Sequence, residues 1–262
     1  MDKLRFFLVF IIGFVIYFYI DANFFSFFQK GITTFTESKA AGHIFAYSIT
    51  LIPLLITVAI LYKSYKNILE KLGLSRSVCL GLAFAFISTL PMLVAYAIKF
   101  KINTALSFDT IIINTISAAF FEEIIYRAFL FGMLYKCTRL GFIPSVFLAS
   151  VLFGAAHLYQ STSINELIGI FLLTFFGSVL FAWIYAEWKF NLWTAILLHF
   201  LMNFYWLIFD VDTHALGGIY ANVFRFLTIF LAILGTVLFK MKKKIPFAIG
   251  RKTWWMKSQK HI

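Results

Sequence analysis

Charged residues are scarce in this 262-residue chain. Asp, Glu, Lys and Arg together make up 13% of it, whereas apolar residues make up 62%. Ordinary soluble domains carry about 25% charged residues. A soluble protein of this size could not cover its surface with so few charges. The composition therefore excludes soluble, fibrous and disordered classes, and it predicts an all-α, polytopic membrane protein.

Cysteine is almost absent as well. The chain has only Cys79 and Cys137, and they do not form a CxxC motif. This number and spacing favour neither a disulfide framework nor a cysteine-based metal site. We interpret both residues as small apolar side chains.

Long apolar segments are what the sequence does contain. A membrane core about 30 Å thick needs roughly 20 mostly apolar residues per helix. By this measure the chain has about eight transmembrane helices, at residues 4–20, 43–62, 78–98, 110–135, 143–159, 166–186, 191–209 and 220–239. The first resembles a signal peptide, but Tyr19-Ile20-Asp21 offers no small-residue cleavage site, so we interpret it as a retained span. We expect a single integral membrane domain over residues 1–262.

The distribution of basic residues predicts the orientation of these spans. Alternate loops, beginning with the N-terminus and including the tail, carry 17 Lys and Arg residues, whereas the opposite loops carry four. The positive-inside rule therefore predicts a multi-pass protein of the cell membrane with both termini in the cytoplasm. The basic tail, residues 240–262, is expected to lie against the anionic lipids of the inner leaflet rather than to bind nucleic acid. Arg225, in the last span, is expected to extend to the interface.

Three charged residues lie deep in the fourth predicted span. A charged group at mid-membrane costs at least about 2.5–3.5 kcal/mol. The other acids, Asp21 and Glu187 among them, are expected in loops or at span ends. Glu123 and Arg127 are four residues apart and can pair on one helix face. Glu122 points about 100° away, and such an unpaired carboxylate can act as a general base. Alternatively, all three residues form an ion-pair network that only holds helices together.

Two further spans contain deep histidines. His157 lies near the end of the fifth span, and His199 lies in the seventh with Asn203 four residues later on the same face. A lone membrane histidine is usually a packing residue, but this set spans three helices. Helix rise places Glu122 and His199 at nearly the same depth. The depths allow one shared site toward the cytoplasmic half of the membrane.

At this point the sequence resembles a known family. Three ordered motifs, which span about residues 110–205, resemble the CAAX-protease and bacteriocin-processing (CPBP, or Abi) family of intramembrane proteases, whose eukaryotic member is the type II CAAX prenyl endopeptidase. The motifs are Glu122-Glu123-x-x-x-Arg127, Phe153-x-x-x-His157 and His199-x-x-x-Asn203. The resemblance implies an eight-helix endopeptidase that cleaves a peptide or membrane protein near the cytoplasmic face. It also implies that Glu122 with His157 activates water, that His199 and Asn203 stabilise the oxyanion, and that Glu123 and Arg127 brace the site.

The need for a metal is left open by these motifs. Family members are often called metalloproteases, and Glu122, His157 and His199 could bind zinc with a water as the fourth ligand. The HExxH motif is absent. Because Asn203 beside His199 suits an oxyanion hole better than a ligand set, we favour glutamate-dependent hydrolysis without a cofactor.

Two non-catalytic functions are alternatives to the enzyme. Glu122 and the histidines could form the proton relay of a transporter, although the sequence shows no inverted repeat or broken helix pair of the transporter kind. A bacteriocin-immunity scaffold that functions without catalysis is another alternative. Relatives are associated with bacteriocin self-immunity, pheromone processing and surface-protein maturation, and the sequence does not choose a substrate among these.

Overall fold

The computed structural model describes residues 3–258, so Asp2 and the last four residues of the basic tail lie outside it. The described residues are almost entirely helical and contain one isolated antiparallel bridge, between Leu140 and Met256. The eight predicted spans correspond to eight helical passes. These are α1 (Lys3–Thr36), α2 (Lys39–Thr50) continued by α3 (Ile52–Tyr62), α5 (Val78–Lys99), the run from α6 (Phe108–Ile111) to α8 (Gly132–Cys137), α9 (Phe142–Ala156), α10 (Ile164–Glu187), α11 (Leu192–Ile208) and α12 (Ile219–Lys243).

Short elements connect some of these passes. They are α4 (Ile68–Leu72), η3 (Leu158–Gln160) and η4 (Arg251–Thr253). Six helices are long and apolar enough to cross a membrane, and α11 is a shorter apolar helix. The prediction of an all-α, multi-pass membrane protein is therefore confirmed.

The first helix is longer than predicted. The expected span ended at residue 20, but α1 continues without a break to Thr36. A helix of this length is about 50 Å long, which exceeds the thickness of a bilayer core. The segment after Asp21 contains no proline and is rich in phenylalanine, so nothing in it ends the helix. Asp21 therefore lies inside a helix and not in a loop, which corrects the prediction.

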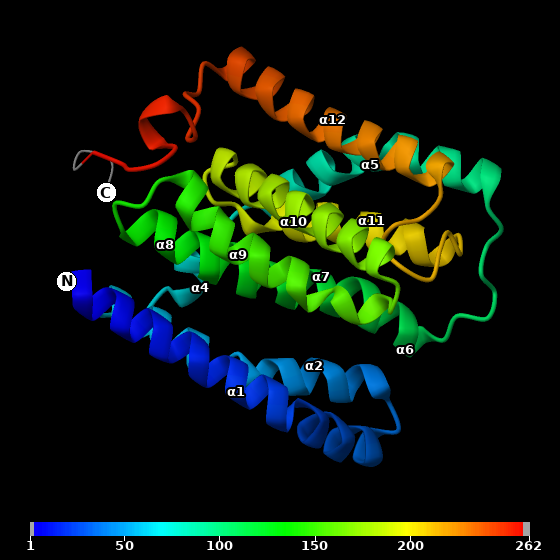
Figure 1. The fold of residues 1–262 in the computed structure, drawn as a ribbon, viewed down its shortest axis with the longest axis horizontal. Helices are drawn as coiled ribbons and strands as arrows, with labels where there is room; N and C mark the ends of the chain where they lie inside the picture. The colour runs from blue at the N-terminus through cyan, green and yellow to red at the C-terminus, as the bar shows by residue number, and fades with distance from the viewer. Residues whose placement is uncertain (1–2, 259–262) are drawn as a thin grey trace.

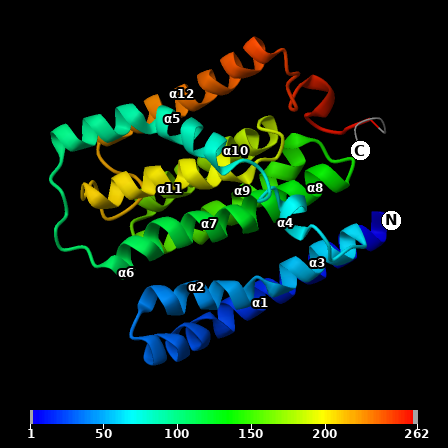
Figure 2. The same cartoon turned by 180° about the vertical axis from the view of Figure 1, so that it is seen from behind.

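The passes are arranged as a central group between two flanking pairs. In Figure 1, α1 and α2 lie along one edge, α5 and α12 lie along the opposite edge, and α7, α9, α10 and α11 lie between them. The reverse view shows α3 beside α1, and α11 in the centre (Figure 2). The two ends of the described chain lie at the same end of the bundle (Figures 1 and 2), as an even number of passes requires.

Aromatic stacking joins the first flanking pair to the central group. Phe10 of α1 stacks on Phe129 with ring centroids 5.0 Å apart, and Tyr47 of α2 stacks on Phe121 at 4.8 Å. Both partners belong to the run of helix that carries the acidic pair. Offset stacking adds about 0.5–1.5 kcal/mol per pair beyond simple burial. These contacts fix the position of the central run.

Glycines allow close approach of helices at two places. A Cβ atom on Gly13 would lie 1.8 Å from Oγ1 of Thr57, so α1 and α3 touch there. A Cβ atom on Gly154 would lie 2.9 Å from the ring of Phe171, so α9 and α10 touch there. Small residues let membrane helices pack in this way. α9 is therefore closely packed against α10 just before His157.

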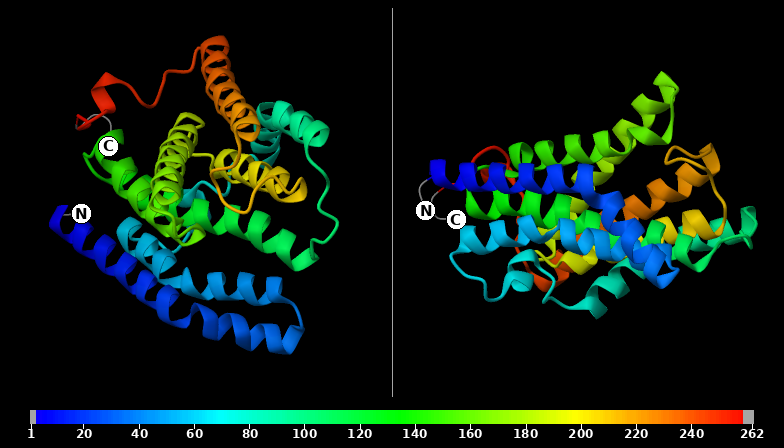
Figure 3. Two further views of the ribbon diagram at one scale, coloured as in Figure 1. Left: turned by 45° about the vertical axis from the view of Figure 1, so that its right-hand side comes forward. Right: turned by 90° about the horizontal axis from the view of Figure 1, so that it is seen from below.

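The C-terminal segment returns across one end of the bundle. After α12 it runs back to lie beside α8 (Figure 3, left). The backbone N–H groups of Gly141 and Ile143 donate to the carbonyls of Trp255 and Trp254 at 2.8 and 2.9 Å. The Nζ atom of Lys257 donates to the carbonyl of Tyr135. Part of the predicted lipid-facing tail is therefore bound to the protein itself.

Candidate active site

The central helical run changes its winding at the acidic pair. It contains two π-helical segments, η1 (Ile112–Ser117) and η2 (Glu123–Phe131), separated by α7 (Ala118–Glu122). Glu122 thus ends an α-helical turn and Glu123 begins a π-helical one. Such wide turns in α-helices are frequent at functional sites, where they change the direction of side chains. The feature singles out this pair on structural grounds.

Glu123 is the centre of the charged cluster. Its side chain is 0% exposed, and its Oε2 lies 3.1 Å from Nε of Arg127, as the four-residue spacing predicts. Its Oε1 lies 2.8 Å from Nδ1 of His199. One carboxylate therefore joins a cation on its own helix to an imidazole on α11. The sequence predicted the first contact but not the second.

Aromatic faces surround the guanidinium of Arg127. Its Cζ lies 4.1 Å from the ring centroid of Phe153 and 5.3 Å from that of Phe181. The side chain is fully buried. Desolvated cation–π contacts contribute about 2 kcal/mol. The cation is thus held by one carboxylate and two rings, which makes it a rigid support for Glu123.

Glu122 differs from its neighbour in its surroundings. Its side chain retains 21% exposure, and its Oε2 lies 4.0 Å from Nε2 of His199. That oxygen is buried and has no hydrogen-bond partner among the described residues. One carboxylate oxygen of Glu122 is therefore buried without a hydrogen-bond partner, while other atoms of the side chain remain partly exposed. The predicted division between a paired Glu123 and an unpaired Glu122 agrees with this geometry.

His157 is positioned by its own helix. It is the residue at which α9 ends, and its Nδ1 lies 2.7 Å from the carbonyl oxygen of Phe153. Because a carbonyl can only accept, Nδ1 carries the proton, and in the neutral ring Nε2 keeps a free lone pair. The ring lies 4.4 Å from that of Phe153, whose ring is 6.5 Å from that of His199. Phe153 thus lies between the two histidines.

Asn203 has a partner of its own. Its side-chain amide donates to the backbone carbonyl of Asn114 in η1 at 3.2 Å. The direct contacts therefore link Glu122, Glu123, Arg127 and His199, whereas His157 and Asn203 are bonded to other groups around them.

The depth of the cluster differs from the expectation. Glu122 lies near the middle of the run from Phe108 to Cys137, and His199 near the middle of α11. His157 lies at the end of α9 that is remote from the chain termini, and Asn203 lies in the corresponding half of α11. The set occupies the middle of the bundle and extends away from the termini. The site was expected in the half of the bundle that carries the chain termini. It does not lie there, because His157 follows the last residue of α9, a full helix length from the end of the bundle with the termini.

The alternative metal ligands do not form a ligand group. Nowhere in residues 3–258 do three or more His, Cys, Asp or Glu side chains come together closely enough to hold a metal ion. Glu122, His157 and His199 are therefore not gathered into such a group among the described residues. His199 also uses Nδ1 on Glu123, which leaves only Nε2 for another partner.

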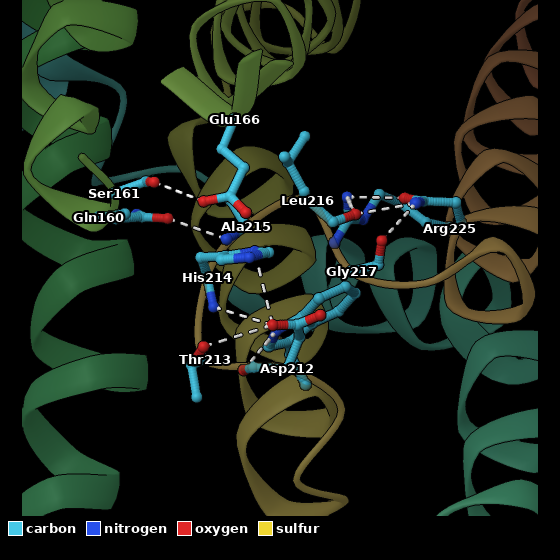
Figure 4. Close-up of polar contacts among 12 residues, drawn as sticks. Gln160, Ser161, Glu166, Asp212, Thr213, His214, Ala215, Leu216, Gly217 and Arg225 are labelled. Atoms are coloured by element: carbon cyan, nitrogen blue, oxygen red, sulfur yellow. Dashed lines mark hydrogen bonds and ion pairs between the residues drawn. The ribbon is translucent and has the colours of Figure 1, made fainter. Parts of the chain in front are cut away.

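Beyond His157, a network of polar contacts ties the remote loops together. Figure 4 shows the loop after α11 meeting the ends of α9, α10 and α12. The backbone N–H of Ala215 donates to Oε1 of Gln160 at 2.8 Å, only three residues from His157. Arg225 Nη1 donates to Oδ1 of Asn222 at 2.9 Å, and its Cζ lies 4.1 Å from the Trp206 ring. Arg225 is therefore buried, and the expectation that it reaches the interface is wrong because partners within the protein satisfy it.

Asp21 is a partly buried acid within a helix, which the sequence reasoning missed. Its Oδ1 has no hydrogen-bond partner among the described residues. Tyr47 and Tyr126 lie within electrostatic range of both Asp21 and Glu122. The phenylalanine-rich sequence after Asp21, uninterrupted by proline, was the signal that the helix continues and that Asp21 lies inside it.

Comparison with known proteins matches this same region. Residues 104–205 match the family described as type II CAAX prenyl endopeptidase Rce1-like. They include Glu122, Glu123, His157, His199 and Asn203. The predicted resemblance is confirmed over this segment.

One curated relative is similar over a segment of equal length. The protein of Bacillus subtilis (strain 168) named "Putative membrane peptidase YdiL" is 33% identical over 102 residues, which are 39% of this chain and 37% of that protein. The chain thus matches little more than a third of the length of this relative. No solved structure matches the chain.

The contacts of the matched segment fit acid–base chemistry. It holds the carboxylate of Glu122, which has an oxygen without a hydrogen-bond partner, and the imidazole of His199, whose Nε2 lies 4.0 Å from that oxygen. The buried pair of Glu123 and Arg127 orients this imidazole. Carboxylates and imidazoles move protons near neutral pH.

Proposed function

We propose that this protein is an intramembrane endopeptidase, which hydrolyses a peptide bond of a membrane-associated peptide or protein. The observation that carries the proposal is the placement of Glu122. Its unpaired Oε2 lies 4.0 Å from Nε2 of His199, while Glu123 holds Nδ1 of the same ring at 2.8 Å. The similarity of residues 104–205 to the Rce1-like family supports the same activity.

Glu122 is the general base of the proposed reaction. Its carboxylate takes a proton from water while the water oxygen forms a bond to the substrate carbonyl carbon. Nε2 of His157 accepts a hydrogen bond from the same water, since Nδ1 is already bonded to the Phe153 carbonyl. When the C–N bond breaks, protonated Glu122 returns the proton to the leaving nitrogen. No atom beyond water and substrate is consumed.

His199 and Asn203 are the proposed oxyanion donors. The amide of Asn203 is a donor without further activation. Nε2 of His199 donates only from the doubly protonated ring, because Nδ1–H is directed at Glu123. Loss of one such donor costs about 2.7–4 kcal/mol of barrier. Glu123 and Arg127 act as positioning residues that fix the orientation of this ring.

Hydrolysis without a bound metal is the form of the mechanism that we propose. It is supported by Asn203, which lies four residues after His199 on α11 and suits an oxyanion donor better than a metal ligand, and by the absence of a three-ligand group in residues 3–258. Dialysis of the purified protein against 1,10-phenanthroline should leave peptide cleavage unchanged. Cleavage that disappears and returns with added zinc contradicts the metal-free mechanism but not the peptidase activity.

The orientation in the membrane is also a proposal. The predominance of basic residues in alternate loops supports cytoplasmic termini in the cell membrane. In that orientation the substrate bond is cleaved at mid-membrane, and His157 and Asn203 lie on the outer side of Glu122.

The decisive experiment compares Glu122→Gln with wild type. Both proteins are purified in neutral detergent and assayed by mass spectrometry on a library of apolar peptides. Since general-base catalysis contributes about 10²–10⁴-fold, cleavage by the variant should fall at least 100-fold. Glu70→Gln, which changes an exposed acid of α4, is the matched control and should retain full activity. Equal cleavage by the Glu122 variant, or a Glu122-dependent proton flux in liposomes without any cleavage, refutes the proposal.

A further inference from the structure

A second candidate site lies at the end of the bundle that carries both termini. An open cavity of about 530 Å³ lies there, bordered by the turn between α10 and α11, the end of α12 and the returning C-terminal segment. Four of its lining residues are basic, namely Arg76, Lys189, Lys240 and Lys244, and one is acidic, Glu187. None of them belongs to the proposed active site.

The acid in this cavity, Glu187, has partners within the protein. The carboxylate of Glu187 is buried and accepts from Nζ of Lys240. It also accepts from the backbone N–H groups of Ala248 and Ile249 at 3.0 and 2.9 Å. Glu187 thus fixes the tail as one wall of the cavity and balances one of the four cations. No other cation of the cavity forms an ion pair with it.

Three cations therefore remain without a counter-charge. Arg76, Lys189 and Lys244 are exposed, and none forms an ion pair with an acid in the part of the chain that the structure describes. They come from three separate elements, before α5, after α10 and after α12. Three like charges around one cavity raise its potential and attract anions.

The backbone of this region adopts an unfavourable conformation to present these groups. Lys189, Phe190 and Lys244 have φ values of 57°, 55° and 53°. Glycine is the usual residue in this left-handed region, because a Cβ atom is disfavoured there. Residues held in such conformations are concentrated at ligand-binding and catalytic positions. Here two of the three are lysines of the cavity.

The remainder of the lining is apolar. Ala186, Phe190, Ile245, Pro246 and Ala248 complete the wall. A basic rim beside an apolar wall matches an amphiphile with an anionic head. At a membrane surface, basic pockets between helices bind lipid head groups, and guanidinium and ammonium groups bind phosphate oxygens well.

We propose that this cavity binds the phosphate group of an amphiphile, with Arg76, Lys189 and Lys244 as its contacts. The apolar wall accommodates the adjoining hydrocarbon. Binding is independent of peptide cleavage, so the two proposals can fail separately. The shared chemistry is a phosphate mono- or diester, whose source is a lipid head group or a free phosphate compound.

The test measures binding to the full-length protein in neutral detergent. Native mass spectrometry follows phosphatidic acid, with phosphatidylcholine of the same chains as the neutral-head comparison, and calorimetry follows inorganic phosphate at constant ionic strength. The variant is Lys189→Gln combined with Lys244→Gln. Its control, Lys63→Gln combined with Lys66→Gln, removes two exposed lysines outside the cavity, one of which also has a left-handed backbone after a helix.

The results distinguish a lipid head group, a free phosphate compound and the absence of a phosphate site. Wild type and control should bind phosphatidic acid at least tenfold more tightly than the cavity variant, with inorganic phosphate much weaker, which identifies a lipid head group. If inorganic phosphate binds as tightly and with the same dependence on Lys189 and Lys244, the source is a free phosphate compound. Equal affinities for the cavity variant and wild type, or equal losses in the variant and its control, overturn the proposal.

Discussion

Nδ1 of His199 lies 2.8 Å from Oε1 of Glu123, and this contact joins two helices through a carboxylate that Arg127 also pairs. The three residues form a buried series of a guanidinium, a carboxylate and an imidazole, in which each side chain contacts the next. A histidine oriented by a carboxylate has a defined tautomer and a defined free nitrogen. In this protein that nitrogen faces Glu122 at 4.0 Å. Glu123 and Arg127 therefore influence the chemistry of Glu122 through the orientation of His199.

Glu123→Gln should reduce both stability and catalysis. The substitution leaves Arg127 buried without a counter-charge, which costs about 3–5 kcal/mol, and it replaces the charged acceptor of Nδ1 of His199 with a neutral amide. Thermal unfolding in detergent and steady-state peptide cleavage measure the two effects. We expect a lower Tm together with a fall in kcat, while KM changes little.

A double variant separates folding from positioning. Glu123→Gln with Arg127→Met removes the unpaired cation, so the Tm should recover most of its loss, while kcat should stay low because His199 still lacks its charged partner. Recovery of kcat together with Tm would falsify the positioning role and assign Glu123 a purely structural one.

Phe153→Leu should impair the site through two contacts at once. The ring lies 4.1 Å from the Arg127 guanidinium and 4.4 Å from the His157 ring. Its removal eliminates a cation–π contact of about 1–2 kcal/mol and leaves His157 less constrained. We expect a lower Tm and reduced cleavage. Phe147→Leu, an exposed position on the same helix, is the control, and equal effects of the two substitutions contradict the interpretation.

Asn203→Ala tests the oxyanion donor. If the amide stabilises the tetrahedral intermediate, kcat should fall about 10²–10³-fold with KM nearly constant. The same side chain also donates to the Asn114 carbonyl at 3.2 Å, so a structural tie predicts a lower Tm instead. A variant with reduced Tm and normal kcat at low temperature identifies Asn203 as a helix tie and removes it from the mechanism.

Much of the fold and one local contact could be predicted from the sequence. Apolar length alone located the eight passes, because a bilayer imposes the same requirement on each of them. The Glu123–Arg127 pair followed from a four-residue spacing, which is a local property of a helix. The comparison over residues 104–205 agrees with the three motifs in order.

Contacts between distant segments could not be predicted. The bond from His199 to Glu123 depends on how α11 is rotated against the central run, and the π-helical winding at Glu123 has no recognised sequence pattern. Glu187 lies at the end of α10, as expected. Its burial was not predicted, because it depends on Lys240 and two tail N–H groups that satisfy its carboxylate. Such pairings join residues more than fifty positions apart, and periodicity carries no information about them.

Lys136 provides a prediction on pH and stability. It lies just beyond the predicted fourth span, where Nζ donates to the hydroxyl of Tyr185 at 3.3 Å. Its pKa is lowered to about 8, chiefly by burial, and the positive charges of Lys71 and Arg76 act in the same direction. An unfolded lysine keeps its proton up to about pH 10.4. Between these two values the unfolded chain binds more protons than the folded one, so this residue makes stability rise with pH.

Lys136→Met removes that dependence. At pH 7 the variant should be more stable than wild type, because it buries no charge, by at most about 3 kcal/mol for a pKa difference of this size. As the pH rises from 8 to 10, the folded wild type loses the proton and its Tm should approach that of the variant. Measuring Tm at pH 7, 8, 9 and 10 for both proteins, and for the exposed control Lys66→Met, tests the sign. A Tm difference that stays constant across this window means that Lys136 keeps its proton in the folded state.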